Sequence, residues 1–166
     1  LNKSILFFEA TPESPPLTSL AVKCGSNIVI IDLSDPHALQ NWIHVEFGFS
    51  HVTAKKMFGK NPVFIFTNVN ETSMNPYNAP FFNALITYLD TARMFNNGYK
   101  IIFFSKISKE NFLYHLRPKI SGQFAGEQYM HAQRVLNEEA MCQFIKIDER
   151  VLREISQLYP TEIKNW

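Results

Sequence analysis

The stretch Asn27-Ile28-Val29-Ile30-Ile31-Asp32-Leu33-Ser34 decides the fold of this chain. It holds four consecutive β-branched residues with no alternation of apolar and polar positions. This is typical of a strand in a parallel sheet that is covered on both faces. Asp35-Pro36 follows at once, and an Asp before a Pro is a common start of a helix. A strand that leads directly into a helix indicates an open α/β sheet.

Four other apolar runs repeat this pattern along the chain. The clearest is Pro62-Val63-Phe64-Ile65-Phe66-Thr67-Asn68, and the others lie at residues 4–8, 99–104 and 143–147. Helical patterns occupy residues 17–23, 38–57, 79–95, 108–118, 127–141 and 149–159, and loops fill residues 68–80 and 121–126. The alternation predicts an α/β fold with a parallel sheet of about five strands and helices on both faces.

The composition is that of one globular domain spanning residues 1–166. Hydrophobic residues make up 46% and charged residues 19%, so the chain can bury a sizeable core. The net charge of +1 gives no reason to expect nucleic acid or an acidic membrane surface as a partner. We see no membrane-spanning run and no signal peptide. Two isolated cysteines, Cys24 and Cys142, favour reduced thiols in a cytoplasmic protein.

The segment between the strands at residues 27–34 and 62–68 contains the candidate residues for a functional site. Trp42 and Glu46 are four residues apart, so they share one face of a helix. A carboxylate on a helix that follows a buried strand lies near the strand's carboxyl end, where open α/β sheets bind their ligands. Among apolar neighbours, Glu46 is either a partly buried functional carboxylate or one paired with a cation. A solvated carboxylate on the helix surface is an equally good interpretation.

Other residues in this region have simpler interpretations as well. Asp32 and Ser34 either cap the following helix or line the same cleft as Glu46, and both can hold at once. His37, His44 and His51 are spaced by seven residues. Seven helical residues rise roughly 10 Å, which is too far for two imidazoles to share one zinc ion, so we expect no metal site. The common phosphate-binding and nucleophile motifs are absent from the sequence.

Taken in order, these features resemble the Toll/interleukin-receptor (TIR) domain family. Four apolar residues precede Asp32 and Ser34, Trp42-x-x-x-Glu46 follows, and the next strand begins at Pro62. The chain is also similar to nucleoside deoxyribosyltransferase-like proteins, whose pattern reads E-h-G-h-A where this chain has Glu46-Phe47-Gly48-Phe49-Ser50. The order of the predicted elements resembles the family over residues 4–104. Recognisable sequence motifs are confined to residues 27–68. It implies a flavodoxin-like parallel sheet.

For function, the resemblance implies an N-glycosidase that cleaves NAD to nicotinamide and an ADP-ribose product, sometimes cyclised. Glu46 would be the catalytic carboxylate that holds the ribose hydroxyls and stabilises an oxocarbenium-like transition state. Trp42, Ser34 and Asp32 would be substrate-binding residues beside it. NAD would be the substrate, and neither a cofactor nor a metal is implied.

The chain also departs from the family pattern at both ends. The family's first strand and helix would precede a segment such as residues 4–12. We therefore expect a divergent relative or a chain that lacks an upstream unit. The segment from about residue 127 is an extra β-α unit beyond the usual domain.

Two other functions stay open. The first is a TIR-like signalling module that self-associates through helix and loop surfaces without catalysis. The second is a helicase or ATPase fragment of viral replication type, with Ile28 to Asp32 as a Walker-B-like strand and Phe64 to Asn68 as the strand that ends in a sensor Asn. The missing phosphate-binding loop weighs against the second.

Overall fold

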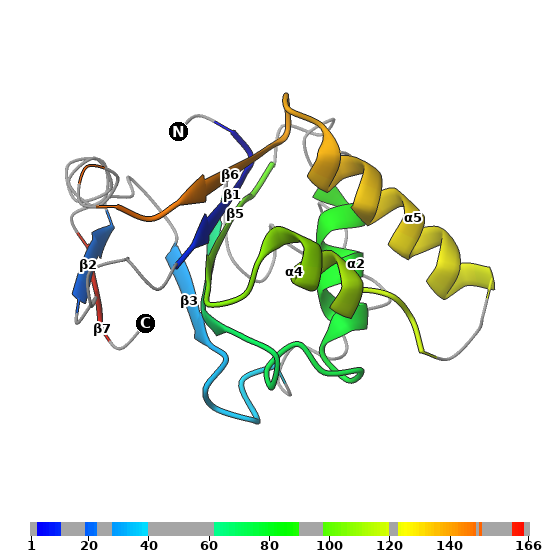
Figure 1. Ribbon diagram of the computed structural model, residues 1–166, viewed down its shortest axis with the longest axis horizontal. Helices are drawn as coiled ribbons and strands as arrows, with labels where there is room; N and C mark the ends of the chain where they lie inside the picture. The colour runs from blue at the N-terminus through cyan, green and yellow to red at the C-terminus, as the bar shows by residue number, and fades with distance from the viewer. Residues whose placement is uncertain are drawn as a thin grey trace.

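Five parallel strands form the centre of the computed structural model (Figure 1). The structure describes residues 3–10, 19–22, 28–39, 62–89, 98–119, 123–148, 150 and 161–164. The strands lie in the order β3-β4-β5-β1-β6. They are β1 (Ile5–Glu9), β3 (Ile28–Asp32), β4 (Val63–Val69), β5 (Lys100–Ser105) and β6 (Cys142–Lys146). The predicted α/β class and the five-stranded parallel sheet are confirmed.

Strand β1 lies inside the sheet, between β5 and β6. Ile5 is in register with Ile101 on one side and with Cys142 on the other. In flavodoxin the first strand lies beside the second. Here β4 and β5 separate β1 from β3. Strand β6, which comes from the segment after residue 127, pairs directly with β1 and is therefore part of the same sheet.

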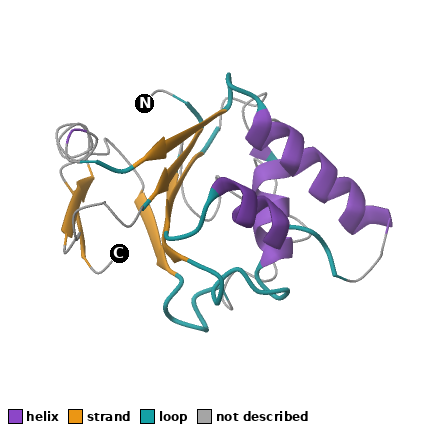
Figure 2. Cartoon of the chain, viewed as in Figure 1, coloured by secondary structure: helices purple, strands orange, loops and turns teal. Residues whose placement is uncertain are grey.

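Three described helices lie on one side of the sheet (Figure 2). They are α2 (Ala79–Thr87), α4 (Lys109–His115) and α5 (Gln123–Asn137). Their apolar side chains form one cluster with Ile5, Phe7 and the residues beside them in the sheet. Leu6 and Phe8 point to the opposite face and are also fully buried. Both faces of the central strands are therefore covered, and the described helices account for one of them.

Phenylalanine rings fill the space between the sheet and the helices, with Phe103 of β5 at the centre. Its ring centroid lies 5.9 Å from Phe7, 5.4 Å from Phe66, 5.9 Å from Phe82 and 5.0 Å from Phe112. The pairs are tilted, stacked or edge-to-face, which are favourable arrangements for aromatic rings. This cluster joins three strands, β1, β4 and β5, to helices α2 and α4.

Strand β3 is less buried than its sequence predicts. Ile30 is 43% exposed, and Val29 is only partly buried. Among the described residues, β3 pairs only with β4 and so lies at the edge of the sheet. The expectation that this run of β-branched residues is covered on both faces is therefore wrong.

The helix expected at residues 17–23 is also wrong where the structure describes it. Ser19–Val22 form strand β2, which pairs antiparallel with β7 (Thr161–Lys164) and places Leu20 opposite Ile163. A short apolar run does not distinguish strand from helix by its periodicity. Pairing with a partner far away in the sequence decides the structure here, and β7 itself is not predicted from the sequence.

The remaining helices agree with the predictions to different degrees. Helix α4 begins as expected, and the Oγ of Ser108 accepts a hydrogen bond of 3.2 Å from the backbone N–H of Asn111. Helix α5 begins at Gln123, so the loop expected at residues 121–126 is wrong for its described part. The helices expected at residues 38–57 and 149–159 lie almost entirely outside the described residues.

We expect Phe103→Ala to lower the free energy of unfolding by about 3–5 kcal/mol, because truncation of a buried phenylalanine loses its burial and leaves a cavity. Urea unfolding followed by circular dichroism measures this change. Tyr77→Ala is the control, because that side chain is 86% exposed and its truncation should change the free energy by less than about 0.5 kcal/mol. Equal effects of the two substitutions would contradict the central place of Phe103.

Candidate functional site at the carboxyl edge of the sheet

The carboxyl ends of β3 and β4 bring two polar side chains together. Asp32 ends β3, and the Nδ2 of Asn68 donates a hydrogen bond of 2.7 Å to the Oδ1 of Asp32. The backbone N–H of Ser34 donates a second bond of 3.0 Å to the same oxygen. Open α/β sheets bind their ligands at this edge. The pair of Asp32 and Asn68 is therefore the first candidate for a functional site.

The carboxylate of Asp32 is held in its charged form. Partial burial acts to raise the pKa of Asp32, but hydrogen bonds from Asn68, Ser34 and Thr67 outweigh burial and hold the pKa below its ordinary value. Asp32 is therefore ionised at neutral pH. It supplies a fixed negative charge that can bind a cation or accept hydrogen bonds from hydroxyl groups.

An irregularity in β4 accompanies the side chain of Asn68. The pairing of β4 with β5 shifts register between Phe66 and Val69. Within the described part of the chain, Asn68 is the only non-glycine residue with a positive φ, 57°. Asn adopts this left-handed conformation more readily than most residues. Bulges of this kind redirect side chains beside functional sites, and here the side chain of Asn68 meets Asp32.

The loop after β4, residues 70–78, is fixed by its own polar side chains. The Oγ of Ser73 donates a 2.9 Å hydrogen bond to the carbonyl of Asn68 and accepts one of 2.9 Å from the N–H of Asn70. The Nδ2 of Asn78 donates to the carbonyl of Ser73 at 2.8 Å. Ser73 is buried, so it anchors the loop against the end of β4. The loop therefore supports the backbone of Asn68.

A second hollow lies at the same edge, over β1 and β6. It has a volume of about 330 Å³ and is lined by Glu9, Lys109, Glu110 and Lys146, among others. In the sheet, β5 and β1 are neighbours. The connection from β1 runs toward β3 at one edge, and the connection from β5 runs toward β6 at the other edge. Such a reversal marks the usual ligand crevice of an open α/β sheet. Sequence reasoning missed these residues, because the order of the strands is not visible in the chain order.

The structure describes two of the four predicted site residues. Asp32 and Ser34 lie together at the end of β3, joined by the hydrogen bond from Ser34 to Asp32. The cap of the following turn is Asp35, whose Oδ1 accepts a 2.9 Å hydrogen bond from the N–H of His37. Asp32 does both: it accepts from the N–H of Ser34 at the start of this turn and from Asn68 across the sheet. Trp42 and Glu46 lie outside the described residues.

The cysteine that the structure describes is not a nucleophile. Cys142 is buried, and burial raises the pKa of its thiol to about 12, although the charge of Lys109 acts in the opposite direction. The thiol is therefore protonated at neutral pH. The other cysteine of the chain, Cys24, lies outside the described residues. Within the described ranges, no three His, Cys, Asp or Glu side chains are grouped to hold a metal ion.

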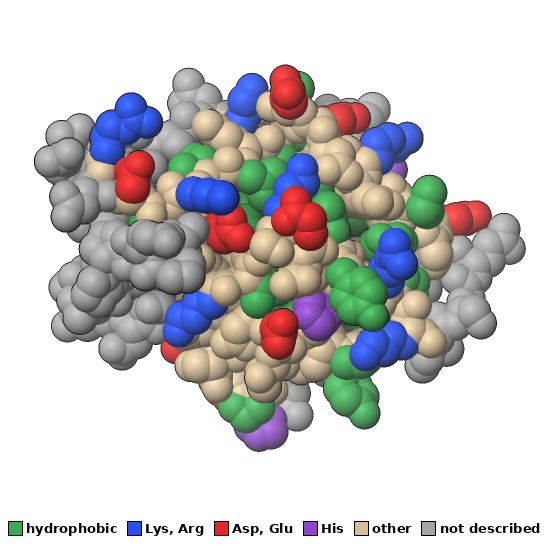
Figure 3. Space-filling model, in the orientation of Figure 1, with side chains coloured by type: hydrophobic (Ala, Val, Ile, Leu, Met, Phe, Trp, Pro, Cys, Tyr) green, Lys and Arg blue, Asp and Glu red, His purple; other side chains and the backbone are tan. Residues whose placement is uncertain are grey.

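The surface over the described helices has mixed charge. In Figure 3, Lys and Arg side chains are interspersed with Asp and Glu side chains instead of forming one patch of a single sign. This face therefore offers no continuous surface for a polyanion. None of the described helices is both long and apolar enough to cross a membrane.

No protein-family model, curated protein or solved structure matches the chain. The resemblance to TIR domains and to nucleoside deoxyribosyltransferase-like proteins therefore stays a hypothesis drawn from the motifs.

We expect Asp32→Asn to lower the free energy of unfolding by about 1 kcal/mol at pH 7, the net value of a typical hydrogen bond. The pKa of Asp32 is lower in the folded chain than in the unfolded chain. The stabilisation is therefore present above the unfolded pKa, near 4, and disappears as the pH falls through the folded pKa. Urea unfolding of both proteins between pH 7 and about pH 3 measures the difference.

Glu71→Gln is the matched control for this series, because it neutralises an exposed carboxylate in the neighbouring loop. We expect it to change the free energy of unfolding by less than about 0.5 kcal/mol. If the difference between wild type and Asp32→Asn grew on acidification, the ionised hydrogen-bonded carboxylate would be the wrong description of this site.

Proposed function

We propose that the carboxyl edge of β3 and β4 binds a ribose of NAD and that the chain cleaves the bond between nicotinamide and ribose. The observation that carries this proposal is the ionised carboxylate of Asp32, oriented by the 2.7 Å hydrogen bond from Asn68. Acidic side chains at strand ends accept hydrogen bonds from ribose hydroxyls in dinucleotide-binding sheets. Ser34 is exposed beside Asp32 and can contribute a further hydroxyl.

In the proposed reaction, the bond between ribose C1′ and the pyridinium nitrogen breaks, and its electron pair moves to the nitrogen. Nicotinamide leaves as a neutral ring, and C1′ becomes an oxocarbenium-like centre. A nearby carboxylate stabilises that positive charge. Water then adds to C1′ and loses a proton, which gives ADP-ribose; attack by a group of the substrate itself would give a cyclised product.

The resemblance assigns the stabilising carboxylate to Glu46 and the stacking surface to Trp42. Both residues stand between β3 and β4 in the sequence, in the segment that follows Asp32. Asp32 would hold the ribose, and Glu46 would act on the reacting carbon. Substitution of Asp32 should therefore affect the binding of NAD, and substitution of Glu46 should affect its turnover.

Thermal unfolding with and without millimolar NAD, followed by assay of released nicotinamide in the same samples, tests the proposal. We expect Glu46→Ala to reduce nicotinamide release at least about a hundredfold while NAD still stabilises the fold, because the lost carboxylate acts mainly in the transition state. We expect Asp32→Asn to weaken NAD binding about tenfold, the effect of one lost hydrogen bond to a charged group. Glu71→Ala should match the wild type in both measurements.

The proposal fails if the wild type neither gains stability from NAD nor releases nicotinamide, or if Glu46→Ala releases it as fast as the wild type. In that case self-association without catalysis becomes the better hypothesis. The dependence of molecular mass on protein concentration, measured by analytical ultracentrifugation, then tests it directly.

One observation favours a second candidate, an ATPase-type site. Asp32 and Asn68 are hydrogen-bonded across neighbouring strands, and this is the relation expected between a Walker-B-like Asp and a sensor Asn. Carboxylate oxygens are among the ligands of Mg²⁺ at such sites, and Asp32 fits this donor type. The missing phosphate-binding loop weighs against this candidate, because the segment after β1 contains prolines where glycines and a lysine are needed.

If the second candidate is correct, ATP with Mg²⁺ will raise the unfolding temperature, and NAD will not. Asp32→Asn should then abolish the part of the shift that depends on Mg²⁺, since it removes the charged oxygen ligand. Glu71→Ala, which neutralises the exposed carboxylate of the neighbouring loop, should retain it. A shift with NAD alone would exclude this candidate in favour of the first.

A further inference from the structure

The hollow over β1 and β6 has a lining of mixed charge. Its volume is about 330 Å³, and its walls come from β1, β6 and the start of α4. On the face seen in Figure 3, positive and negative side chains lie close together over these elements. Small-molecule sites commonly have volumes of about 300–1,000 Å³. The hollow therefore suits one part of a dinucleotide better than the whole.

The register of β1 and β6 places a carboxylate and an ammonium group side by side. Glu9 is paired with Lys146 across the two strands. The ring of Phe7 packs against Phe144 and against Phe112 of α4. Residues two apart on a strand share a face, so Glu9 and Lys146 leave the sheet on the same side as these rings. The phenylalanines form an apolar floor, and the two charged side chains stand beside it.

The ammonium group of Lys109 is fixed at the α4 wall of the hollow. Its Nζ lies 4.4 Å from the centroid of the Phe144 ring, which is a favourable cation–π arrangement. Lys109 begins α4, and α4 is the described helix that follows β5. The side of the hollow toward β5 therefore carries a positive charge. A lysine ammonium is a point charge that commonly binds phosphate.

The hollow offers an acceptor and several donors to an occupant. Glu9 is half-buried, Lys146 is exposed, and neither forms an ion pair with a described residue. The Oγ of Ser108 accepts a hydrogen bond from the N–H of Asn111 and keeps its own proton to donate. Glu110 also lines the hollow, but it is exposed, so water and salt screen its charge. A sugar phosphate fits this set, because its hydroxyls donate and its phosphate oxygens accept.

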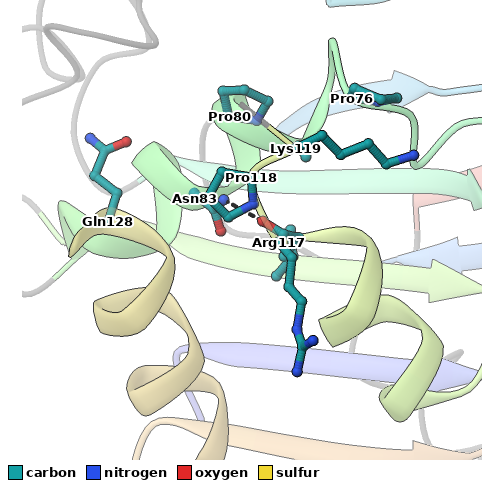
Figure 4. Close-up of a pocket in the computed structure, with 9 residues that line it drawn as sticks. Pro76, Pro80, Asn83, Arg117, Pro118, Lys119 and Gln128 are labelled. Carbon is teal, nitrogen blue, oxygen red and sulfur yellow. Dashed lines mark hydrogen bonds between the residues drawn. The ribbon is translucent and has the colours of Figure 1, made fainter. Parts of the chain in front are cut away.

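The helix layer holds a smaller pocket that lacks this combination (Figure 4). It has a volume of about 140 Å³ and is lined by Asn83 of α2 and Gln128 of α5, among others. The Oδ1 of Asn83 and the Nε2 of Gln128 are buried without a hydrogen-bond partner among the described residues. In Figure 4 these two atoms turn away from each other, and the Nδ2 of Asn83 donates a 2.8 Å hydrogen bond to the carbonyl of Leu116. Asn83 therefore joins α2 to α4 instead of sharing a ligand with Gln128.

The hollow and Asp32 lie on the same edge of the sheet. Asp32 ends β3 and Glu9 ends β1, and two strands, β4 and β5, lie between them. In dinucleotide-binding sheets, an acidic side chain accepts hydrogen bonds from a ribose of the ligand. A dinucleotide contains two riboses joined through a pyrophosphate. Two acidic strand ends on one edge, with Lys109 on the β5 side of the second, match that order of groups.

We propose that this hollow binds the adenosine half of the dinucleotide whose other ribose lies at Asp32. The hydroxyls of the adenosine ribose would donate to Glu9, and the phosphate on the adenosine side would lie beside Lys109. Lys146 would offset the charge of Glu9, so that the carboxylate does not repel the phosphate. This inference rests on the proposed function for the identity of the ligand. Binding of the isolated half, AMP, requires no cleavage of NAD.

Isothermal titration calorimetry with AMP tests this proposal. We expect one saturable site per chain. Adenosine should bind at least about tenfold more weakly, because it lacks the phosphate that Lys109 attracts. The 2′,3′-dideoxy form of AMP should also bind about tenfold more weakly, the effect of lost hydrogen bonds to a charged group. Inorganic phosphate alone should not compete with AMP at equal concentration.

Two variants assign the contacts. Glu9→Gln should remove the preference for AMP over its dideoxy form, while binding of the dideoxy form stays within about twofold of the wild type. Lys109→Gln should weaken AMP binding about tenfold and leave adenosine binding unchanged. Glu138→Gln and Lys119→Gln are the matched controls, because both residues are exposed and neither lines the hollow. Thermal unfolding without ligand checks that each variant is folded.

The proposal is overturned if AMP shows no saturable binding at millimolar concentration, or if Glu9→Gln and Lys109→Gln bind it as the wild type does. It is also overturned if Asp32→Asn weakens AMP binding and these two variants do not, because AMP would then occupy the other end of the edge. Failure of the proposed function has a different pattern. In that case AMP binds and responds to both variants, but no nicotinamide is released from NAD.

Discussion

The burial of β1 between two strands from distant parts of the chain is the constraint on which the structure depends. Residues 5–9 pair with residues 100–105 on one side and 142–146 on the other. The ring of Phe7 packs against Phe103, Phe112 and Phe144, which come from β5, α4 and β6. The sheet is therefore complete only when β1 is paired with both β5 and β6. All five strands run parallel, so their carboxyl ends meet at one edge.

The fold creates two kinds of polar site from this frame. At the sheet edge, β3 has one described neighbour, so Asp32 stays partly accessible to water and its charge is stabilised by donated hydrogen bonds. In the helix layer, Asn83 and Gln128 are almost fully buried, and each keeps one polar atom without a partner in the described structure. At the first site, hydrogen bonds within the protein already stabilise the charge of Asp32 without a ligand. The second keeps hydrogen-bonding capacity that none of the described residues uses.

The sequence predicts those elements whose signals lie within a few neighbouring residues. Apolar runs located the five strands of the sheet, and Ser108 located the start of α4, because both signals lie within a few residues. The pairing of β2 with β7 has no such signal, since its partners are far apart in the sequence. Asp32 was found because it ends an apolar strand. Asn83 and Gln128 were not found, because each is an ordinary polar residue until the packing of α2, α4 and α5 buries it.

The strand order also constrains how a nucleotide would use the carboxyl edge. Asp32 lies at the margin of the described sheet, whereas the reversal of chain direction lies beside β1, near Glu9, Lys109 and Lys146. From β3 to β1 the edge spans three strand spacings, about 14 Å. Under the proposed function, a dinucleotide with its ribose at Asp32 would extend along this edge, over β4 and β5, toward the two lysines. The pyrophosphate is joined to that ribose through a single methylene group, so it would lie over the neighbouring strands, and the adenosine half would extend toward the hollow that Glu9, Lys109, Glu110 and Lys146 line.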